Sequence, residues 1–251
     1  MDTILASLRD QHAELAALLD GLDERGWQRP TPCEGWAVRD VMTHLAQTDR
    51  MALGSATGRY AEVLAALTDG LGPAASVDEG ADLMVRRERD LPSDALRERW
   101  SAGAAALVDA LAALDPSARV TWVAGELSAR SLATTRLAET WIHAGDVAAA
   151  LGTSLPPTDR LQLVARLAWR TLPYAFARAG RDLTGPVAFD LVGPTGTPWR
   201  FLPDEPPVTT IRGDAAELCA VAARRRTPAE TGLTGEGPDA DAVLDLVRTY
   251  A

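Results

Sequence analysis

The sequence predicts a protein of the α plus small α+β class, in which a four-helix bundle precedes a small mixed unit. Through the first part of the chain, apolar residues recur at spacings of three and four, which is the pattern of amphipathic helices. After Gly180, apolar and polar residues alternate in short segments that are bounded by glycine- and proline-rich turns, which is typical of strands. The chain has 251 residues, enough for both parts. We expect the bundle over residues 1–155, a connecting helix within 156–184 and the α+β unit over 185–251.

Four long helical segments are expected in the first part. Each combines an apolar seam with a local signal that starts or stops the helix. The segments span residues 2–23, 36–56, 77–114 and 128–151. Pro92 interrupts the third segment, and Ser93 is a suitable N-cap for the helix that follows. The stretch over 115–131 is expected to be a loop. Four such segments with irregular connections pack naturally as a four-helix bundle.

The second part begins with a helix and then changes character. A helix is expected over residues 159–179, and Pro173 should kink it or end its first half. Beyond it, alternating segments bounded by turn residues predict strands, the first two forming a hairpin. The expected strands span 186–193, 197–203 and 208–213, and the expected helices span 214–226 and 238–250. Strands and helices in this order predict a small α+β unit.

Composition limits the partners and the compartment. The net charge is −10, which argues against nucleic acid and anionic membranes. No apolar run is long enough for a membrane span, and the N-terminus lacks the features of a signal peptide. The two cysteines, Cys33 and Cys219, lie far apart in the sequence, which fits a reducing cytoplasm. We expect a cytoplasmic monomer or homodimer that acts on a small molecule.

The fourth segment carries an unusual set of polar residues. Glu139, His143 and Asp146 share one helical face and are flanked by small apolar residues. Burying a glutamate and a histidine together is costly unless a charge partner or a metal binds them. His44, on the second segment, can face them across a bundle core. Two histidines and one glutamate leave coordination positions open, as in a catalytic zinc site.

Other interpretations of these residues stay open at this stage. A Glu-x-x-x-His pair also occurs on ordinary solvated helices, where it binds no metal. His12, next to the seam of the first segment, is a rival third ligand. Cys33 precedes the second segment, where a helix N-terminus stabilises a thiolate, so it is a candidate fourth ligand or nucleophile. A small buried side chain is the alternative role for Cys33.

Two motifs resemble those of a known family. "TPCEGWAVRDVMTHLAQTD" and the later "RLAETWIHAGDVAAALG" resemble the mycothiol-dependent maleylpyruvate isomerase family, which belongs to the DinB-like metal-binding bundle superfamily. The C-terminal "VTTIRGDAAELCAVAARRRTPAETGLTGEG" looks like that family's small second domain, which resembles a sterol-carrier-protein fold. The resemblance covers nearly the whole chain. Two stretches are most similar to a branch of the superfamily described only as metal-binding.

The resemblance implies specific roles for residues. It places the metal ligands at His44, Glu139 and His143, and it implies a divalent metal, most often zinc, with mycothiol as a possible thiol cofactor. It also places at Arg225 the arginine that holds a substrate carboxylate. Asp146 lies one turn beyond His143, where it can orient an imidazole or take a proton. Trp36 and Asp49 are candidates for lining the cofactor cavity.

The function expected from these features is metal-dependent catalysis on a small anionic substrate. Bound to zinc, a small thiol or water becomes a nucleophile at neutral pH. The reaction would be cis–trans isomerisation or S-transfer. Two alternatives belong to other classes: a non-catalytic metal- or ligand-binding protein, including a regulator, and a biosynthetic enzyme that uses the same pocket for other Lewis-acid chemistry.

Overall fold

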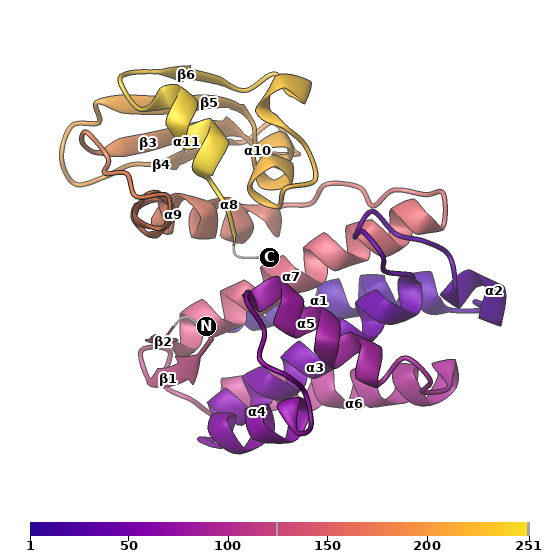
Figure 1. Cartoon of the computed structure of the whole chain (residues 1–251). Helices are drawn as coiled ribbons and strands as arrows, with labels where there is room; N and C mark the ends of the chain where they lie inside the picture. The colour runs from indigo at the N-terminus through magenta and orange to yellow at the C-terminus, as the bar shows by residue number, and fades with distance from the viewer. Residues whose placement is uncertain (124, 250–251) are drawn as a thin grey trace. The chain divides into compact units, whose positions relative to one another are not determined.

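The chain divides into two compact units, each described here by itself. A computed structural model describes residues 1–123 and 125–249 (Figure 1). The first unit comprises Met1–Leu155 and the second comprises Pro156–Ala251. The first is mainly helical, and the second combines a sheet with helices. The class predicted from the sequence, α plus a small α+β part, is therefore confirmed.

Four long helices dominate the first unit. α3 lies against α6 and α7, and α1 lies against the same two helices. Shorter helices and one hairpin complete the unit, with α4 and α5 both against α3 (Figure 1). The elements are α1 (Asp2–Leu19), α2 (Glu24–Trp27), α3 (Val38–Ala56), α4 (Tyr60–Thr68), α5 (Val77–Arg87), α6 (Ser93–Ala112), β1 (Arg119–Trp122), β2 (Gly125–Ser128) and α7 (Ala129–Ala150).

Local contacts explain where α3 and α7 begin and where α7 ends. At the start of α3, the Asp40 carboxylate accepts a hydrogen bond of 2.9 Å from the Ala37 amide. This satisfies one of the amides that a helix N-terminus leaves unpaired. At the start of α7, the Ser128 hydroxyl accepts a hydrogen bond from the Ser131 amide. α7 ends before Gly152, which adopts a φ of 75° that favours glycine.

The core of the first unit lies between its long helices. Buried leucines of α1, α3 and α6 fill it together with Trp27 of α2 and Trp100 of α6, and α7 contributes Ala144 and Val147. Small side chains let a helix approach its neighbours closely, so most of α7 is buried. Polar residues on α7 are therefore held in a protein interior rather than in water.

The second unit is built on a four-stranded sheet. The strand order is β4-β3-β5-β6, in which β3 pairs antiparallel with β4 and parallel with β5. Helices α8 and α10 pack together, and α11 lies against β5 and β6. The elements are α8 (Leu161–Arg170), α9 (Leu172–Arg178), β3 (Val187–Val192), β4 (Pro198–Phe201), β5 (Thr209–Asp214), α10 (Ala215–Ala222), a 3-10 turn (Pro228–Glu230), β6 (Thr234–Glu236) and α11 (Ala240–Leu246). The predicted hairpin of the first two strands is confirmed.

Several predicted boundaries differ from the structure. The expected loop over 115–131 contains the antiparallel pair β1 and β2. Ser93 is the first residue of α6 and makes no cap; its hydroxyl instead donates to Glu24. The helix expected over 159–179 is two helices, α8 and α9, because Pro173 in the first turn of α9 has no amide to donate. Both belong to the second unit, whereas a connecting segment was expected there.

The last helix is also shorter than expected. It was expected over 238–250, but α11 ends at Leu246, and Tyr250 lies outside the described residues. Across residues 1–123 and 125–249, no helix is both long and apolar enough to cross a bilayer.

Candidate metal centre

Two helices of the first unit bring the three predicted metal ligands together. α3 supplies His44, and α7 supplies Glu139 and His143 one turn apart. His44 Nε2 lies 3.5 Å from Glu139 Oε2, and His143 Nε2 lies 3.8 Å from the same oxygen. One donor atom from each residue lies within 4.8 Å of the other two. Two imidazole nitrogens and one carboxylate oxygen thus face a common point.

This donor set fits a zinc ion in both chemistry and spacing. Ligand atoms about 2.1 Å from a tetrahedral zinc lie about 3.4 Å from one another. The separations of 3.5 and 3.8 Å from the glutamate oxygen to the two imidazoles are close to that value. Three protein ligands leave a fourth position for water, a thiol or a substrate. Three such ligands would therefore form an open site rather than a closed structural one.

Burial and neighbouring charges prepare these side chains to bind a cation. Burial lowers the pKa of His44, and the neighbouring His143 adds to that effect, so the His44 imidazole is neutral at neutral pH. Burial alone would raise the pKa of Glu139. Its hydrogen bond to His44 and the electrostatic effects of His143 and Arg136 outweigh burial, so the Glu139 pKa lies below its usual value. An ionised carboxylate and a neutral imidazole are the forms that bind a metal.

Asp146 fixes the orientation of one of the imidazoles. Its Oδ2 atom lies 2.9 Å from His143 Nδ1, and the aspartate side chain is 2% exposed. An ionised carboxylate accepts hydrogen bonds but donates none, so this contact favours the tautomer with the proton on Nδ1. The lone pair of His143 then lies on Nε2, which faces Glu139. Carboxylate–histidine–metal arrangements of this kind are common in zinc sites.

Cys33 lies on the other side of His143. Its sulfur is 3.2 Å from Asp146 Oδ2 and 4.0 Å from His143 Nδ1. Cys33, His143 and Asp146 therefore form a second group whose donor atoms lie close together. In that group the imidazole would have to bind through Nδ1, at the expense of its hydrogen bond to Asp146. The first group requires no such loss.

Arg136, to which no sequence motif assigned a role, connects the two ligand-bearing helices. It is 1% exposed, and its Nε atom lies 3.0 Å from Oδ1 of Asp49, which is fully buried. Its Nη2 donates to Thr48 Oγ1, and its Nη1 lies 4.0 Å from Glu139 Oε2. An arginine three residues before Glu139 lies on the ligand-bearing face of the helix, and this spacing is the signal that could have identified it.

Asp49 was expected to line a cofactor cavity. In the structure, one of its carboxylate oxygens instead forms an ion pair with Arg136. Within the described residues, its Oδ2 atom is buried and has no hydrogen-bond partner. Contact between Asp49 and a cofactor stays a prediction, and the ion pair is the role that the geometry supports.

Trp36 lies beside His44. The two ring centroids are 5.1 Å apart, and the indole Nε1 donates to Asp82 of α5 at 3.2 Å. The tryptophan is half-buried, so one part of it contacts the site while α5 holds the other. Its predicted role in lining a cofactor cavity stays a prediction.

Two other predicted residues lie elsewhere. His12 of α1 packs edge-on against Trp100 of α6, with ring centroids 5.9 Å apart, and it is absent from both donor groups found among the described residues. Arg225 lies in the second unit, after α10, where it is exposed and donates from Nη1 to the Ala223 carbonyl. Its role toward a substrate stays a prediction.

Comparisons with known proteins agree with this architecture. A family model described as the mycothiol maleylpyruvate isomerase N-terminal domain matches residues 8–148. Two uncharacterized proteins, from two strains of Mycobacterium tuberculosis, are each 33% identical over 252 aligned positions, covering 98% of this chain and 95% of theirs. The crystal structure of a mycothiol-dependent maleylpyruvate isomerase has a TM-score of 0.62 at 21% identity. A histidine-to-alanine mutant of that enzyme has a TM-score of 0.63 at 20% identity. Each covers 95% of both chains.

Proposed function

Since the chain belongs to the mycothiol-dependent maleylpyruvate isomerase family, we propose that it is a metal-dependent enzyme that activates a small thiol for cis–trans isomerisation or S-transfer on a small anionic substrate. The observation that carries this proposal is the convergence of His44, Glu139 and His143 on one point. A site held by three ligands retains an open position, which catalysis needs and a purely structural zinc site lacks.

In this proposal each of the site residues has a distinct role. His44, Glu139 and His143 hold a divalent metal, most reasonably zinc given two nitrogen donors and one oxygen donor. When bound, such a metal lowers the pKa of a coordinated thiol or water and polarises a carbonyl oxygen. Asp146 keeps the proton of His143 on Nδ1. Trp36, held by Asp82, restricts water beside His44.

The thiol, which we propose to be mycothiol, supplies the chemistry of the isomerisation. Addition of a thiol sulfur to an activated cis double bond breaks the π bond, and rotation about the resulting single bond followed by loss of the thiol gives the trans isomer. If the thiol stays on the product, the reaction is S-transfer. Both outcomes begin with a thiolate, so the same site serves either reaction.

Calorimetry of the zinc-loaded chain with mycothiol tests this function. The wild-type protein should bind the thiol and release protons, because the thiol ionises on binding. His44→Ala should lose this binding, whereas His12→Ala should keep it, because His12 lies outside the donor group. If His44→Ala still binds mycothiol, the proposal that this site activates a thiol is wrong. If the wild type does not bind mycothiol, the thiol mechanism is wrong. The alternatives are then activation of water, direct Lewis-acid chemistry or a non-catalytic role.

We further propose that Arg225 holds the carboxylate of the substrate. The proposal is supported by the residue type and by its exposed position after α10, since a guanidinium can bind a carboxylate in a bidentate manner. With maleylpyruvate as the probe, Arg225→Ala should raise the Michaelis constant while leaving kcat nearly unchanged. Arg178→Ala, an exposed arginine in the same unit, is the matched control. An unchanged Michaelis constant in Arg225→Ala would reject the anchor.

A further inference from the structure

The three proposed metal ligands are largely covered. The side chains of His44, Glu139 and His143 are 14%, 11% and 7% exposed. Trp36 lies beside them, with its ring centroid 5.1 Å from that of His44. Since little of the three side chains is open to solvent, a thiol reaches the open position among them only if part of the covering structure moves.

α5 packs across the face of α3 that carries His44. Asp40, His44 and Gln47 follow one another at spacings of four and three, so they share that face. Gln47 donates to the Met84 carbonyl of α5 at 2.9 Å. Arg89, just beyond α5, donates to Asp40 at 2.9 Å. α5 and the turn after it therefore contact α3 both before and after His44.

The two halves of α5 are held differently. Met84 and Val85 are buried, and Met84 belongs to an apolar cluster with Met51 of α3. Of the described residues 72–83, which lead into α5 and form its first turns, none is buried, and all of residues 72–79 are exposed. Burial of two apolar side chains anchors the second half of the helix, whereas the first half gains no such stabilisation.

One hydrogen bond connects these first turns with the metal centre. The Trp36 indole Nε1 donates to Asp82 Oδ1 at 3.2 Å. The Asp82 side chain is 30% exposed, and its other oxygen pairs with Arg86 of the same helix at 2.8 Å. Among the hydrogen bonds of the described residues, the Trp36–Asp82 contact is the one that joins residues 72–83 to a distant part of the chain.

We propose that residues 72–83 form a lid over the metal centre, which the Asp82–Trp36 hydrogen bond holds closed and the buried second half of α5 anchors. When this bond breaks, the first turns of α5 move away, Trp36 loses its support, and His44 becomes accessible to a small molecule. Few buried apolar contacts and partly exposed hydrogen bonds are the features of segments that open locally. That the lid admits a thiol rests on the proposed function, whereas the opening itself needs no metal.

Acylation by diethyl pyrocarbonate in the metal-free full chain measures how accessible each of the three histidines is. Arginines separate the histidines in the sequence, so trypsin places them in three different peptides for mass spectrometry. His44 should be acylated about three- to tenfold faster in Asp82→Ala than in the wild type, as expected for one lost hydrogen bond. Asp82→Asn retains an acceptor oxygen and should stay near the wild-type rate. Because neither zinc nor thiol is present, the result does not depend on the proposed function.

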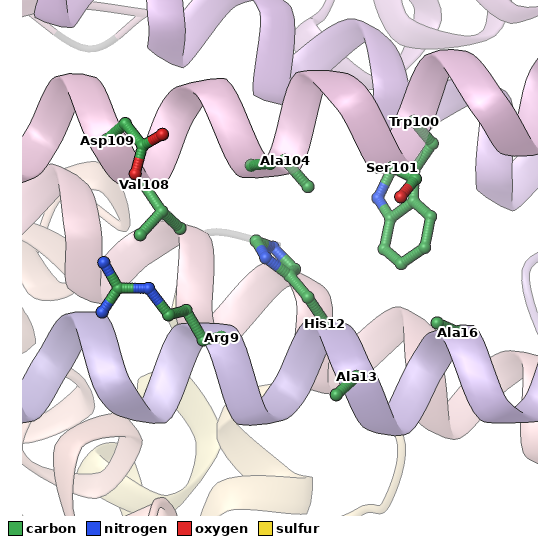
Figure 2. A pocket seen from close by; sticks show the side chains of 10 residues that line it. Arg9, His12, Ala13, Ala16, Trp100, Ser101, Ala104, Val108 and Asp109 are labelled. Atoms are coloured by element: carbon green, nitrogen blue, oxygen red, sulfur yellow. The ribbon is translucent and has the colours of Figure 1, made fainter.

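Three controls separate this hydrogen bond from other effects. Arg86→Ala removes the other partner of Asp82, and Asp78→Ala removes an exposed acid one turn earlier on α5. Both should leave the His44 rate unchanged. Figure 2 shows His12 reaching from α1 toward α6, whereas α5 packs against α3, so the His12 rate should be the same in every variant. A rise at His12 as large as that at His44 would mean that the whole unit loosens, and it would overturn the proposal.

Hydrogen exchange followed by nuclear magnetic resonance shows whether the lid itself moves. In the wild type, the amides of residues 80–83 should exchange faster than those of α3, at a rate that low urea concentrations do not change, because a local opening exposes little surface. Asp82→Ala should speed exchange in 80–83 and leave α3 unchanged. An unchanged His44 rate in Asp82→Ala would overturn the proposal. A faster His44 rate without faster exchange in 80–83 would mean that Trp36 moves alone, and it would overturn the lid.

Discussion

Asp146 is the residue on which the tautomer of His143 depends. Its carboxylate lies 2.9 Å from Nδ1 and also accepts from the Cys33 thiol at 3.2 Å. With the proton held on Nδ1, Nε2 is free to bind a cation beside Glu139. The acid therefore acts on the proposed metal through the imidazole, as a positioning residue. Removing it should cost affinity while leaving the three ligands in place.

Asp146→Ala is expected to weaken zinc binding by about ten- to a hundredfold, the usual effect of losing a carboxylate partner of a metal-bound histidine. Competition with a zinc-sensitive dye measures the dissociation constant. Asp10→Ala, an exposed acid on α1, is the control and should bind zinc like the wild type. Cys33→Ser should also bind normally if the metal lies among His44, Glu139 and His143. A loss in Cys33→Ser as large as that in Asp146→Ala would place the metal in the second group instead.

The positions of some of these site residues follow from the sequence more directly than those of others. Glu139 and His143 lie four apart on one helix, so their shared face follows from helical geometry alone. His44 required a guess that the second and fourth segments face each other, and the structure brings the three side chains together. Their role as ligands stays a prediction. The pairing of Arg136 with Asp49 joins residues 87 positions apart, and no local pattern reports such a contact.

A buried ion pair joins α3 and α7. Arg136 and Asp49 are 1% and 0% exposed, and Arg136 also donates to Thr48, whose hydroxyl donates to the His44 carbonyl. A buried ion pair adds little net stability compared with apolar residues, but breaking it leaves a charge without a partner. We therefore expect the pair to hold α3 and α7 in one alignment, and with them the three proposed ligands.

Arg136→Met should lower the free energy of unfolding by about 3–5 kcal/mol, because Asp49 is left charged and buried. Adding Asp49→Val should recover most of that loss, since both charges are then absent. Urea unfolding of the metal-free chain measures both values. Arg97→Met, which breaks an exposed pair with Asp20, should have little effect. If the double variant is as unstable as Arg136→Met, the unpaired charge is not the cause.

At the level of elements, long helices were predicted well and short ones poorly. α1, α3, α6 and α7 have enough turns for an apolar period to appear. β1 and β2 have four residues each, too few to show alternation, and their stability comes from pairing with each other. α4 was not expected, because few of its side chains are buried and its period is weak. Pro173 did mark the break between α8 and α9.

The whole molecule combines two units with separate cores. Buried leucines and tryptophans of the helices fill the first, and the second is filled from its sheet and helices, with Phe189, Ile211 and Phe176 among the buried side chains. The fold class follows from sequence because each unit has its own hydrophobic period. Metal chemistry is proposed for the first unit and anion binding at Arg225 for the second. The metal centre is the part on which the proposed function depends.

Zinc content after equilibrium dialysis of the full chain tests that centre most directly. The wild type and His12→Ala should each retain one zinc per chain. His44→Ala, Glu139→Ala and His143→Ala should each retain far less, because two remaining ligands bind zinc weakly. Circular dichroism should show that all five proteins keep their helices. Full zinc retention in the three ligand variants, or none in the wild type, would contradict the account.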